Sequence, residues 1–245
     1  MLQQTGVHRV LPKWRAFVDV FPRPDDCARA PLGDVLRLWQ GLGYPRRARN
    51  LHEAARSIVN DHAGAVPSSL DDLLDLPGVG PYTARAVLAF AFEVDTAVVD
   101  TNIARVLARF HGRTLKAREA QLLADAWVPV GEAWLWNQAL MDLGATVCRN
   151  RPTCDECPLA RRCAWRGRGV DPSVGSAGVS VAQPRFEGSD RQARGRLLRV
   201  LSQTPVSVEV IATAMNRSDE VAQRLVHDLL RDGLIVRDGD DLRLP

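Results

Sequence analysis

The cysteines are the residues whose types and spacing point most directly to chemistry. Cys27 stands alone, and the other four lie within sixteen positions, at Cys148, Cys154, Cys157 and Cys163. Such a cluster suits a metal centre in a reducing compartment better than a disulfide framework. Gaps of five, two and five residues separate the four thiolates, which suit either a [4Fe–4S] cluster or a tetrahedral zinc ion. Spacing alone leaves both metals open.

A lone carboxylate, Asp100, is the candidate for acid–base or charge-stabilising chemistry. It follows the apolar residues Val98 and Val99 and precedes a stretch with helical periodicity. An aspartate in that setting is commonly the N-cap of a helix. Asp100 lies eighteen residues after Tyr82, which belongs to a glycine motif, and this distance favours a role beyond that of a helix cap.

The glycine motif, residues 76–84, reads Leu-Pro-Gly-Val-Gly-Pro-Tyr-Thr-Ala and directly precedes an alanine-rich helix. Gly78 and Gly80 allow a tight turn and leave amide groups uncovered at a helix N-terminus, where a phosphate can bind. We therefore expect a helix-hairpin-helix in which Gly78, Val79 and Gly80 contact the DNA backbone. The alternative is a plain turn between two helices.

The elements that would position these residues are predicted to be mainly helical. Short amphipathic helices run from Val7 to Arg109, and two more are expected at 117–128 and 131–147, the second leading into the cysteines. Residues 167–188 are rich in Gly, Ser, Val and Pro, which is typical of a linker. Three helical patterns and two short strands about an Asp-Gly turn then predict a small winged-helix-like domain.

Composition limits the class of protein. With 46% hydrophobic and 25% charged residues the chain should fold. No apolar run approaches the roughly 20 residues that span a bilayer, and no signal pattern opens the chain, so we expect a cytoplasmic protein of bacterial type, in the cytosol or nucleoid. The net charge of only +3 is weak support for a polyanion partner, but six arginines gather between Cys148 and Arg168.

The glycine motif, with an aspartate just after the helix that follows it, resembles the helix-hairpin-helix glycosylase superfamily. The resemblance runs from Met1 to about Trp165. The resemblance narrows to adenine DNA glycosylases of the MutY type on four stretches, at 1–5, 41–44, 47–51 and 137–145. It implies a mainly α, helix-hairpin-helix glycosylase fold with a [4Fe–4S] cluster loop. The domains expected are a helical-barrel domain (1–110), an iron–sulfur cluster domain (111–165), a linker (166–190) and the winged-helix-like domain (191–245).

The resemblance implies a catalytic group of Asp100, Tyr82 and Asn102. Endonuclease III, a relative, has a lysine nucleophile where this chain has Tyr82, and without an amine no Schiff base can form, so a monofunctional glycosylase is expected. Tyrosine at this position also occurs in thymine-mismatch glycosylases. The expected activity is removal of adenine mispaired with 8-oxoguanine or guanine, in base-excision repair.

The resemblance also implies the partner and the cofactor. Gln4 and Tyr44 fill or wedge the base stack, and Thr5 belongs to the same motif. Arg149 and Arg151 are candidates for phosphate contacts from a loop organised by a [4Fe–4S] cluster. The family spacing has six residues in the first gap between cysteines, where this chain has five. The partner expected is double-stranded DNA containing a mismatch, bound by a monomer.

One catalytic group of the family is not found in the sequence. The general acid is a glutamate two residues before the Met-Leu-Gln-Gln-Thr motif, which here begins at Met1. We expect this chain, as written, to excise adenine poorly, either because its start is misplaced or because it is catalytically impaired. The alternatives are a non-catalytic mismatch- or lesion-binding protein, a thymine-mismatch or endonuclease III-like enzyme, and an iron–sulfur transcription regulator. Residues 191–245 look too short and too helical for the 8-oxoguanine-inspecting domain with which many relatives end.

Overall fold

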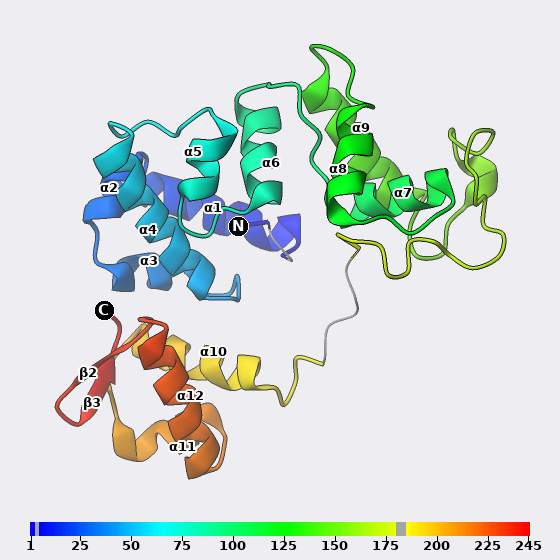
Figure 1. Ribbon diagram of the computed structural model, residues 1–245. Coiled ribbons are helices and arrows are strands. Elements are labelled where there is room, and N and C mark those ends of the chain that lie inside the picture. The colour runs from blue at the N-terminus through cyan, green and yellow to red at the C-terminus, as the bar shows by residue number, and fades with distance from the viewer. Residues whose placement is uncertain (3–4, 180–184) are drawn as a thin grey trace. The chain divides into compact units, whose positions relative to one another are not determined.

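The computed structural model describes residues 1–2, 5–179 and 185–245, and within them it is mainly helical, as predicted (Figure 1). Contacts divide the chain into two compact units. The first unit comprises Met1–Pro67, Leu76–Gly78 and Gln183–Pro245, and the second comprises Ser68–Asp75 and Val79–Ala182. Within the described part of the chain, every helix falls short of the length and apolar character that a bilayer crossing would require.

The first unit begins with four helices. They are α1 (Val7–Val20), α2 (Pro24–Arg29), α3 (Leu32–Trp39) and α4 (Arg46–Asp61), and α4 packs against both α2 and α3. The apolar residues of α4 recur at helical spacing, so that Ala48, Ala55 and Ile58 are buried on one side. Pro24 begins α2 at a position where a missing N–H costs nothing.

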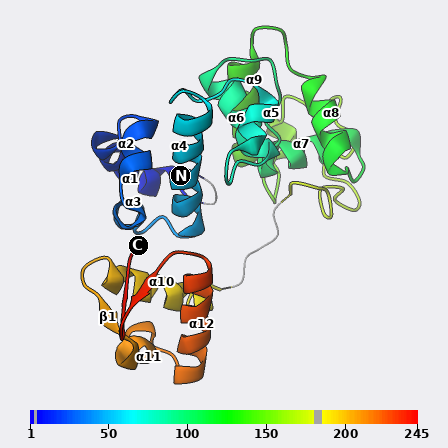
Figure 2. The ribbon, with the colours of Figure 1, turned by 60° about the vertical axis from the view of Figure 1, so that its left-hand side comes forward.

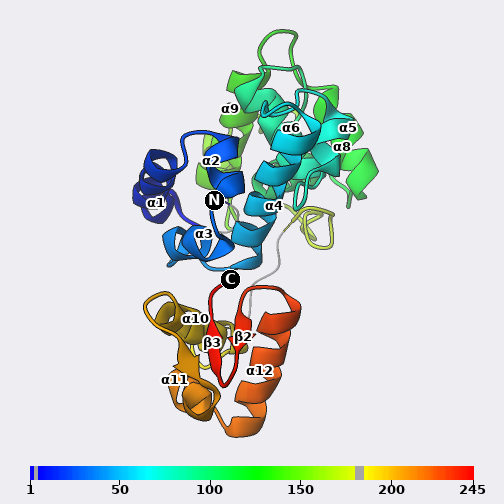
Figure 3. The ribbon, with the colours of Figure 1, turned by 90° about the vertical axis from the view of Figure 1, so that its left-hand side faces the viewer.

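The C-terminal part of this unit has the predicted winged-helix arrangement (Figure 3). It consists of α10 (Asp190–Leu201), β1 (Val206–Ser207), a 3-10 turn (Val208–Val210), α11 (Ile211–Met215), α12 (Asp219–Arg231), β2 (Val236–Asp238) and β3 (Asp241–Arg243). The strands form an antiparallel sheet in the order β1-β3-β2. The sequence did not predict β1, because two residues are too few to show alternation.

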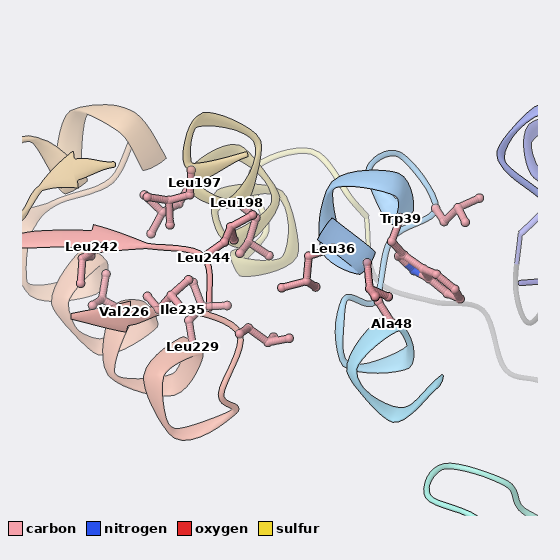
Figure 4. Close-up of a cluster of buried hydrophobic side chains, with 14 of the residues drawn as sticks. Leu36, Trp39, Ala48, Leu197, Leu198, Val226, Leu229, Ile235, Leu242 and Leu244 are labelled. Carbon is pink, nitrogen blue, oxygen red and sulfur yellow. The ribbon is translucent and has the colours of Figure 1, made fainter. Parts of the chain in front are cut away.

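A single hydrophobic core joins the N-terminal helices to the winged helix (Figure 4). Leu36 and Trp39 of α3 share it with Leu197 of α10 and Leu244 near the C-terminus. Polar contacts reinforce it: the amide of Gly33 donates to the carbonyl of Pro245 at 2.9 Å, and a Cβ on Gly33 would lie 2.6 Å from that oxygen. The winged helix is therefore packed on α3 as part of one folded unit.

The second unit is built around α7 (Thr101–His111) (Figure 2). Its other helices are α5 (Leu70–Asp75), α6 (Pro81–Ala91), α8 (Ala117–Asp125), α9 (Ala133–Thr146) and a 3-10 turn (Cys154–Glu156). Both α8 and α9 pack on α7, and Ile103 and Leu107 of α7 are fully buried with Leu140 of α9 beside them. The cysteines follow α9 almost at once, as the sequence indicated.

Residues 171–179, in the stretch without sustained periodicity, contain neither helix nor strand but are fastened to α7 and its C-terminal loop. Asp171 forms an ion pair with Arg109 at 2.6 Å. The hydroxyl of Ser176 accepts from the amide of Leu115, and the amide of Ala177 donates to the carbonyl of Leu115. This part of the chain is therefore ordered by specific polar contacts that periodicity does not reveal.

Candidate active site and nucleic-acid interface

Asp100 is the N-cap of α7, where its carboxylate is held by three donors. One oxygen accepts from the backbone amides of Asn102 and Ile103, at 2.9 and 2.7 Å, and the other accepts from the side-chain amide of Asn102 at 2.9 Å. Burial raises the pKa of Asp100 above its ordinary value, against the lowering effect of these donors. A carboxylate fixed at a helix N-terminus and partly removed from water is suited to stabilise a nearby cation.

The chain approaching Asp100 is fixed by a buried amide. Asn137 of α9 is fully buried, accepts from the amide of Val98 at 2.7 Å and donates to the carbonyl of Thr96 at 2.9 Å. Both backbone groups would otherwise be unpaired in the interior, which is costly. Asn137 lies in a stretch that carries the family resemblance, and the structure gives it the work of positioning the segment before Asp100.

Tyr82 lies in the first turn of α6 and interacts electrostatically with Asp100. Burial raises the pKa of Tyr82, and the negative charge of Asp100 raises it further. Its side chain is still 42% exposed. The structure therefore brings together Asp100, Tyr82 and Asn102, the three residues expected at the catalytic centre, and none of the three is a primary amine.

Arg105, which the sequence did not single out, links this centre to the first cysteine. Its guanidinium donates to the side-chain oxygen of Asn102 at 2.9 Å, to the carbonyl of Gly144 at 2.6 Å and to the carbonyl of Cys148 at 2.7 Å. The signal that could have revealed it is its spacing, because residues three apart share a helix face. Arg105 fixes Asn102, the residue that holds Asp100.

The close approach of α9 to α7 behind this centre requires a glycine. A Cβ on Gly144 would lie 2.6 Å from the Cβ of Asn102 and 2.9 Å from its carbonyl oxygen. Real Cβ atoms are not found so close to other heavy atoms. Gly144 therefore allows the close approach of α9 to α7 at which Arg105 reaches the Gly144 carbonyl.

The glycine motif forms the connection between α5 and α6. Gly78 has φ +77, and a Cβ there would lie 2.5 Å from the side chain of Asn50, so glycine is required on both counts. Gly80 is the N-cap residue of α6 and has no side-chain cap, and a Cβ there would meet nothing within 4 Å. An uncapped helix N-terminus beside open space can accept a phosphate oxygen.

In the first unit, residues 41–44 form a sharp loop, here called the Tyr44 loop, organised by Arg47. Gly41, Gly43 and Tyr44 all have positive φ, at 90°, 72° and 49°. Arg47 donates to the carbonyls of Leu42 and Gly43 at 2.9 and 3.2 Å, and its guanidinium lies 5.4 Å from the Tyr44 ring. The hydroxyl of Thr5 donates to the carbonyl of Leu42 at 3.2 Å. Gln4 lies outside the described residues.

All four clustered cysteines line one cavity, together with Arg109, Arg166 and Trp165. Within the described chain, no three His, Cys, Asp or Glu side chains have the arrangement that would bind a single metal ion. Burial raises the pKa of Cys148, an effect that the neighbouring Arg109 guanidinium opposes. Cys27 is buried elsewhere, and burial raises its thiol pKa to about 11.

The surroundings of the cavity suit a group that carries negative charge on sulfur. Arg109 donates to the Cys148 sulfur, and the backbone amide of Arg166 donates to the Cys163 sulfur, both at 3.5 Å. The indole N–H of Trp165 is buried without a hydrogen-bond partner among the described residues. Four clustered thiols, two of which accept from such donors, fit an iron–sulfur cluster, whose sulfurs accept hydrogen bonds.

Arg149 and Arg151 lie in the same loop with exposed side chains. Arg149 donates to the carbonyl of Arg151 at 3.2 Å, which keeps this turn closed. Arg109 of α7 donates to the carbonyl of Arg149 at 2.7 Å. The loop therefore presents cations to solvent on a backbone that is anchored from α7.

The chain is similar in sequence to known proteins. Residues 1–132 match the model of the family described as HhH-GPD superfamily base excision DNA repair protein. The chain belongs to this family. It is 42% identical to an adenine DNA glycosylase of Mycolicibacterium smegmatis, over 98% of this chain and 83% of that protein.

Two solved structures are similar to this chain. In each case the similarity covers 68% of this chain and 80% of the chain in the solved structure. One is a thermostable thymine-DNA glycosylase, with TM-score 0.65 and 32% identity. The other is a trapped endonuclease III–DNA covalent intermediate, with TM-score 0.62 and 26% identity. The predicted fold class, with helix-hairpin-helix glycosylase fold and small C-terminal domain, is thus confirmed.

Proposed function

We propose that this protein is a monofunctional adenine DNA glycosylase that removes adenine paired with 8-oxoguanine or guanine in duplex DNA. The observation that carries the proposal is the Asp100 carboxylate, held on three donors with Tyr82 as its neighbour. The name of the Mycolicibacterium relative, which matches nearly the whole chain, supports adenine as the base. The solved endonuclease III complex supports DNA as the partner.

The chemistry follows from the charge that develops as the base departs. The bond between C1′ and N9 breaks and its electron pair goes to adenine, which takes a proton from the general acid, the glutamate that the family resemblance gives to the position two residues before Met1. The sugar becomes an oxocarbenium ion until water adds to C1′ and loses a proton to the glutamate carboxylate. Asp100 stabilises this cation electrostatically, and its ionised form is required. Asn102 and Arg105 hold the carboxylate in place without touching the substrate.

Tyr82 makes covalent catalysis by an imine impossible at its position. A phenol cannot form a Schiff base with the abasic sugar. The enzyme therefore releases the base and leaves the strand intact. Borohydride added during turnover should trap no covalent protein–DNA adduct, and an adduct in stoichiometric yield would contradict this part of the proposal.

Cys148, Cys154, Cys157 and Cys163 would hold a [4Fe–4S] cluster, which organises the surrounding loop and takes no part in bond breaking. Arg149 and Arg151 would contact DNA phosphates from that loop, and Gly78, Val79 and Gly80 would contact another phosphate through backbone amides. The Tyr44 loop, with Gln4 and Thr5, would fill the gap left by the extruded adenine. The protein would act as a monomer.

The experiment identifies the released base. The chain is extended at its N-terminus so that a glutamate stands two residues before Met1, the position that the family resemblance gives to the general acid. It is incubated with duplexes containing adenine opposite 8-oxoguanine, adenine opposite guanine, and thymine opposite guanine, and free bases are separated by chromatography. Adenine from the first two duplexes is expected. Release of thymine alone would overturn the proposal in favour of a thymine-mismatch enzyme.

A further inference from the structure

The C-terminal domain touches the Tyr44 loop directly. Arg191, in the first turn of α10, donates from its guanidinium to the hydroxyl of Tyr44 at 3.1 Å. The two residues are 147 positions apart in the sequence, and both belong to the first unit. A side chain of the winged helix therefore holds the polar end of the residue proposed to enter the base stack.

Tyr44 is held at both ends in a conformation that it would not adopt alone. Its φ of 49° is uncommon for a residue with a side chain, and such backbone persists only where the surroundings fix it. The Arg47 guanidinium lies 5.4 Å from the centre of the Tyr44 ring and 5.4 Å from that of the Trp39 ring. With Arg191 on the hydroxyl, the ring is fixed in position before DNA arrives.

The contact is part of a longer array in which aromatic rings and arginines alternate. Arg191 lies 5.9 Å from the ring centre of Phe186, which is 58% exposed. The order is Trp39, Arg47, Tyr44, Arg191 and Phe186. Trp39 is buried, whereas Tyr44 and Phe186 are exposed. Exposed aromatic side chains next to a cation are the combination with which proteins bind unstacked bases and the neighbouring phosphates.

The winged helix is fixed firmly enough to act in this way. Asp232, at the end of α12, is 5% exposed and forms ion pairs with Arg46 of α4 and Arg194 of α10. Arg49 donates to the carbonyl of Asp232 at 2.6 Å. Arg194 is one turn after Arg191 on the same helix, so this cluster fixes the end of α10 that carries Arg191.

We propose that the C-terminal domain takes part in recognising the mismatch, with Arg191 as a positioning residue that holds Tyr44 for entry into the base stack. The inference rests on the proposed function, because it assigns Tyr44 to the DNA interface. It gives residues 185–245 a role at the duplex that their winged-helix fold alone does not indicate. The part of the duplex expected to contact Tyr44 and Arg191 is the base left without its partner, together with the phosphate beside that base.

The test is a double-mutant cycle that measures how strongly each variant unstacks the bases of bound DNA. The full chain and its Arg191→Ala, Tyr44→Phe and doubly substituted variants are titrated with a duplex in which 2-aminopurine lies beside an adenine:8-oxoguanine pair. Fluorescence of the probe reports unstacking, and anisotropy reports affinity for this duplex and for a fully paired one. Arg199→Ala is the control, since Arg199 is exposed and lies on α10 two turns beyond Arg191.

Each single substitution should lower the unstacking signal and the preference for the mismatch by roughly two- to tenfold, the effect of one lost hydrogen bond. The double variant should lose no more than the larger single loss, because both changes remove the same contact. Arg199→Ala should leave the preference unchanged. All variants should keep the thermal unfolding midpoint of the parent to within a few degrees.

Two results would overturn the inference. Additive losses in the double variant would show that Arg191 acts independently of Tyr44. An equal loss of affinity for paired and mismatched DNA in Arg191→Ala would show that it supplies only general attraction to phosphate. A parent chain that binds both duplexes equally and unstacks neither would instead contradict the proposed function itself.

Discussion

At the scale of single residues, Asp100 serves as a helix cap and as the proposed catalytic carboxylate. The family resemblance singled out Asp100 and Tyr82, and the structure places them within electrostatic reach of each other. Spacing could have revealed Arg105, which lies three residues after Asn102 on the same helix face, but not Arg47 or Arg191. Arg47 acts through backbone carbonyls and Arg191 through a distant side chain, and such contacts depend on the packing of elements and leave no local pattern.

The pH dependence of excision should reflect the burial of Asp100. Its pKa is raised above the ordinary 3.8, and the ionised form is the one that stabilises the sugar cation. The rate should therefore fall as the pH drops through this raised pKa, and the acidic limb of the profile should lie above pH 3.8. The single-turnover rate of the extended chain, measured against pH, is the check. An acidic limb at or below 3.8 would show that Asp100 is not the group being titrated.

The same shift has a consequence for stability. Because the folded chain binds the Asp100 proton more tightly than the unfolded chain, ionisation costs stability, and the cost grows as pH rises from the unfolded pKa to the folded one. At neutral pH Asp100→Asn removes that cost and keeps a good N-cap. Its unfolding midpoint should equal or exceed that of the parent, whereas Asp100→Ala should lose about 0.5–2 kcal/mol with the cap. A marked loss of stability in the Asn variant, seen by thermal denaturation, would contradict this balance.

At the scale of elements, periodicity predicted the helices at 117–128 and 131–147 to within a few residues, and they are α8 and α9. The glycine motif, the helix from Thr101 and the helix leading into the cysteines all appear where the sequence indicated. Residues 171–179 could not be predicted, since their order comes from Asp171, Ser176 and Ala177 contacting α7 and the loop after it. A flexible stretch and an ordered stretch without helix or strand can have the same composition, so composition does not distinguish them.

The contact between α7 and α9 is expected to tolerate no side chain at Gly144. Gly144→Ala forces a Cβ against Asn102, and overpacking of this kind typically costs about 1–3 kcal/mol. The matched control is Gly195→Ala in α10, where a Cβ meets nothing within 4 Å. Alanine should stabilise that helix by roughly 0.5–1 kcal/mol. Chemical denaturation of both variants is the measurement, and an unchanged stability of Gly144→Ala would show that α7 and α9 are not so closely packed.

At the scale of the whole molecule, the cysteine loop is expected to hold iron. Anaerobically purified protein should be brown, with broad visible absorbance and about four irons per chain, as a [4Fe–4S] cluster requires. Substituting Cys154 by Ser should bleach it. Colourless protein containing zinc and no iron would show that the four thiols form a tetrahedral site, the alternative that spacing left open.

The C-terminal domain shows which features of the whole molecule cannot be predicted from its sequence. Its three helices and hairpin were predicted from local patterns, whereas the core that it shares with α3 and the Arg191–Tyr44 contact join residues far apart in the chain. No local signal encodes such long-range packing. The similarity to the Mycolicibacterium relative extends over 98% of this chain, so it includes residues of this domain.

The most direct test of the account compares adenine release by the N-terminally extended chain and by its Asp100→Asn variant. Both are assayed in single turnover with a duplex carrying adenine opposite 8-oxoguanine, and affinity is measured on the same duplex. The extended chain should release adenine. The Asn variant should bind the duplex with similar affinity and release almost none, because only the ionised carboxylate stabilises the sugar cation. An Asn variant that folds, binds and releases adenine at the parent rate would show that Asp100 is a helix cap and nothing more.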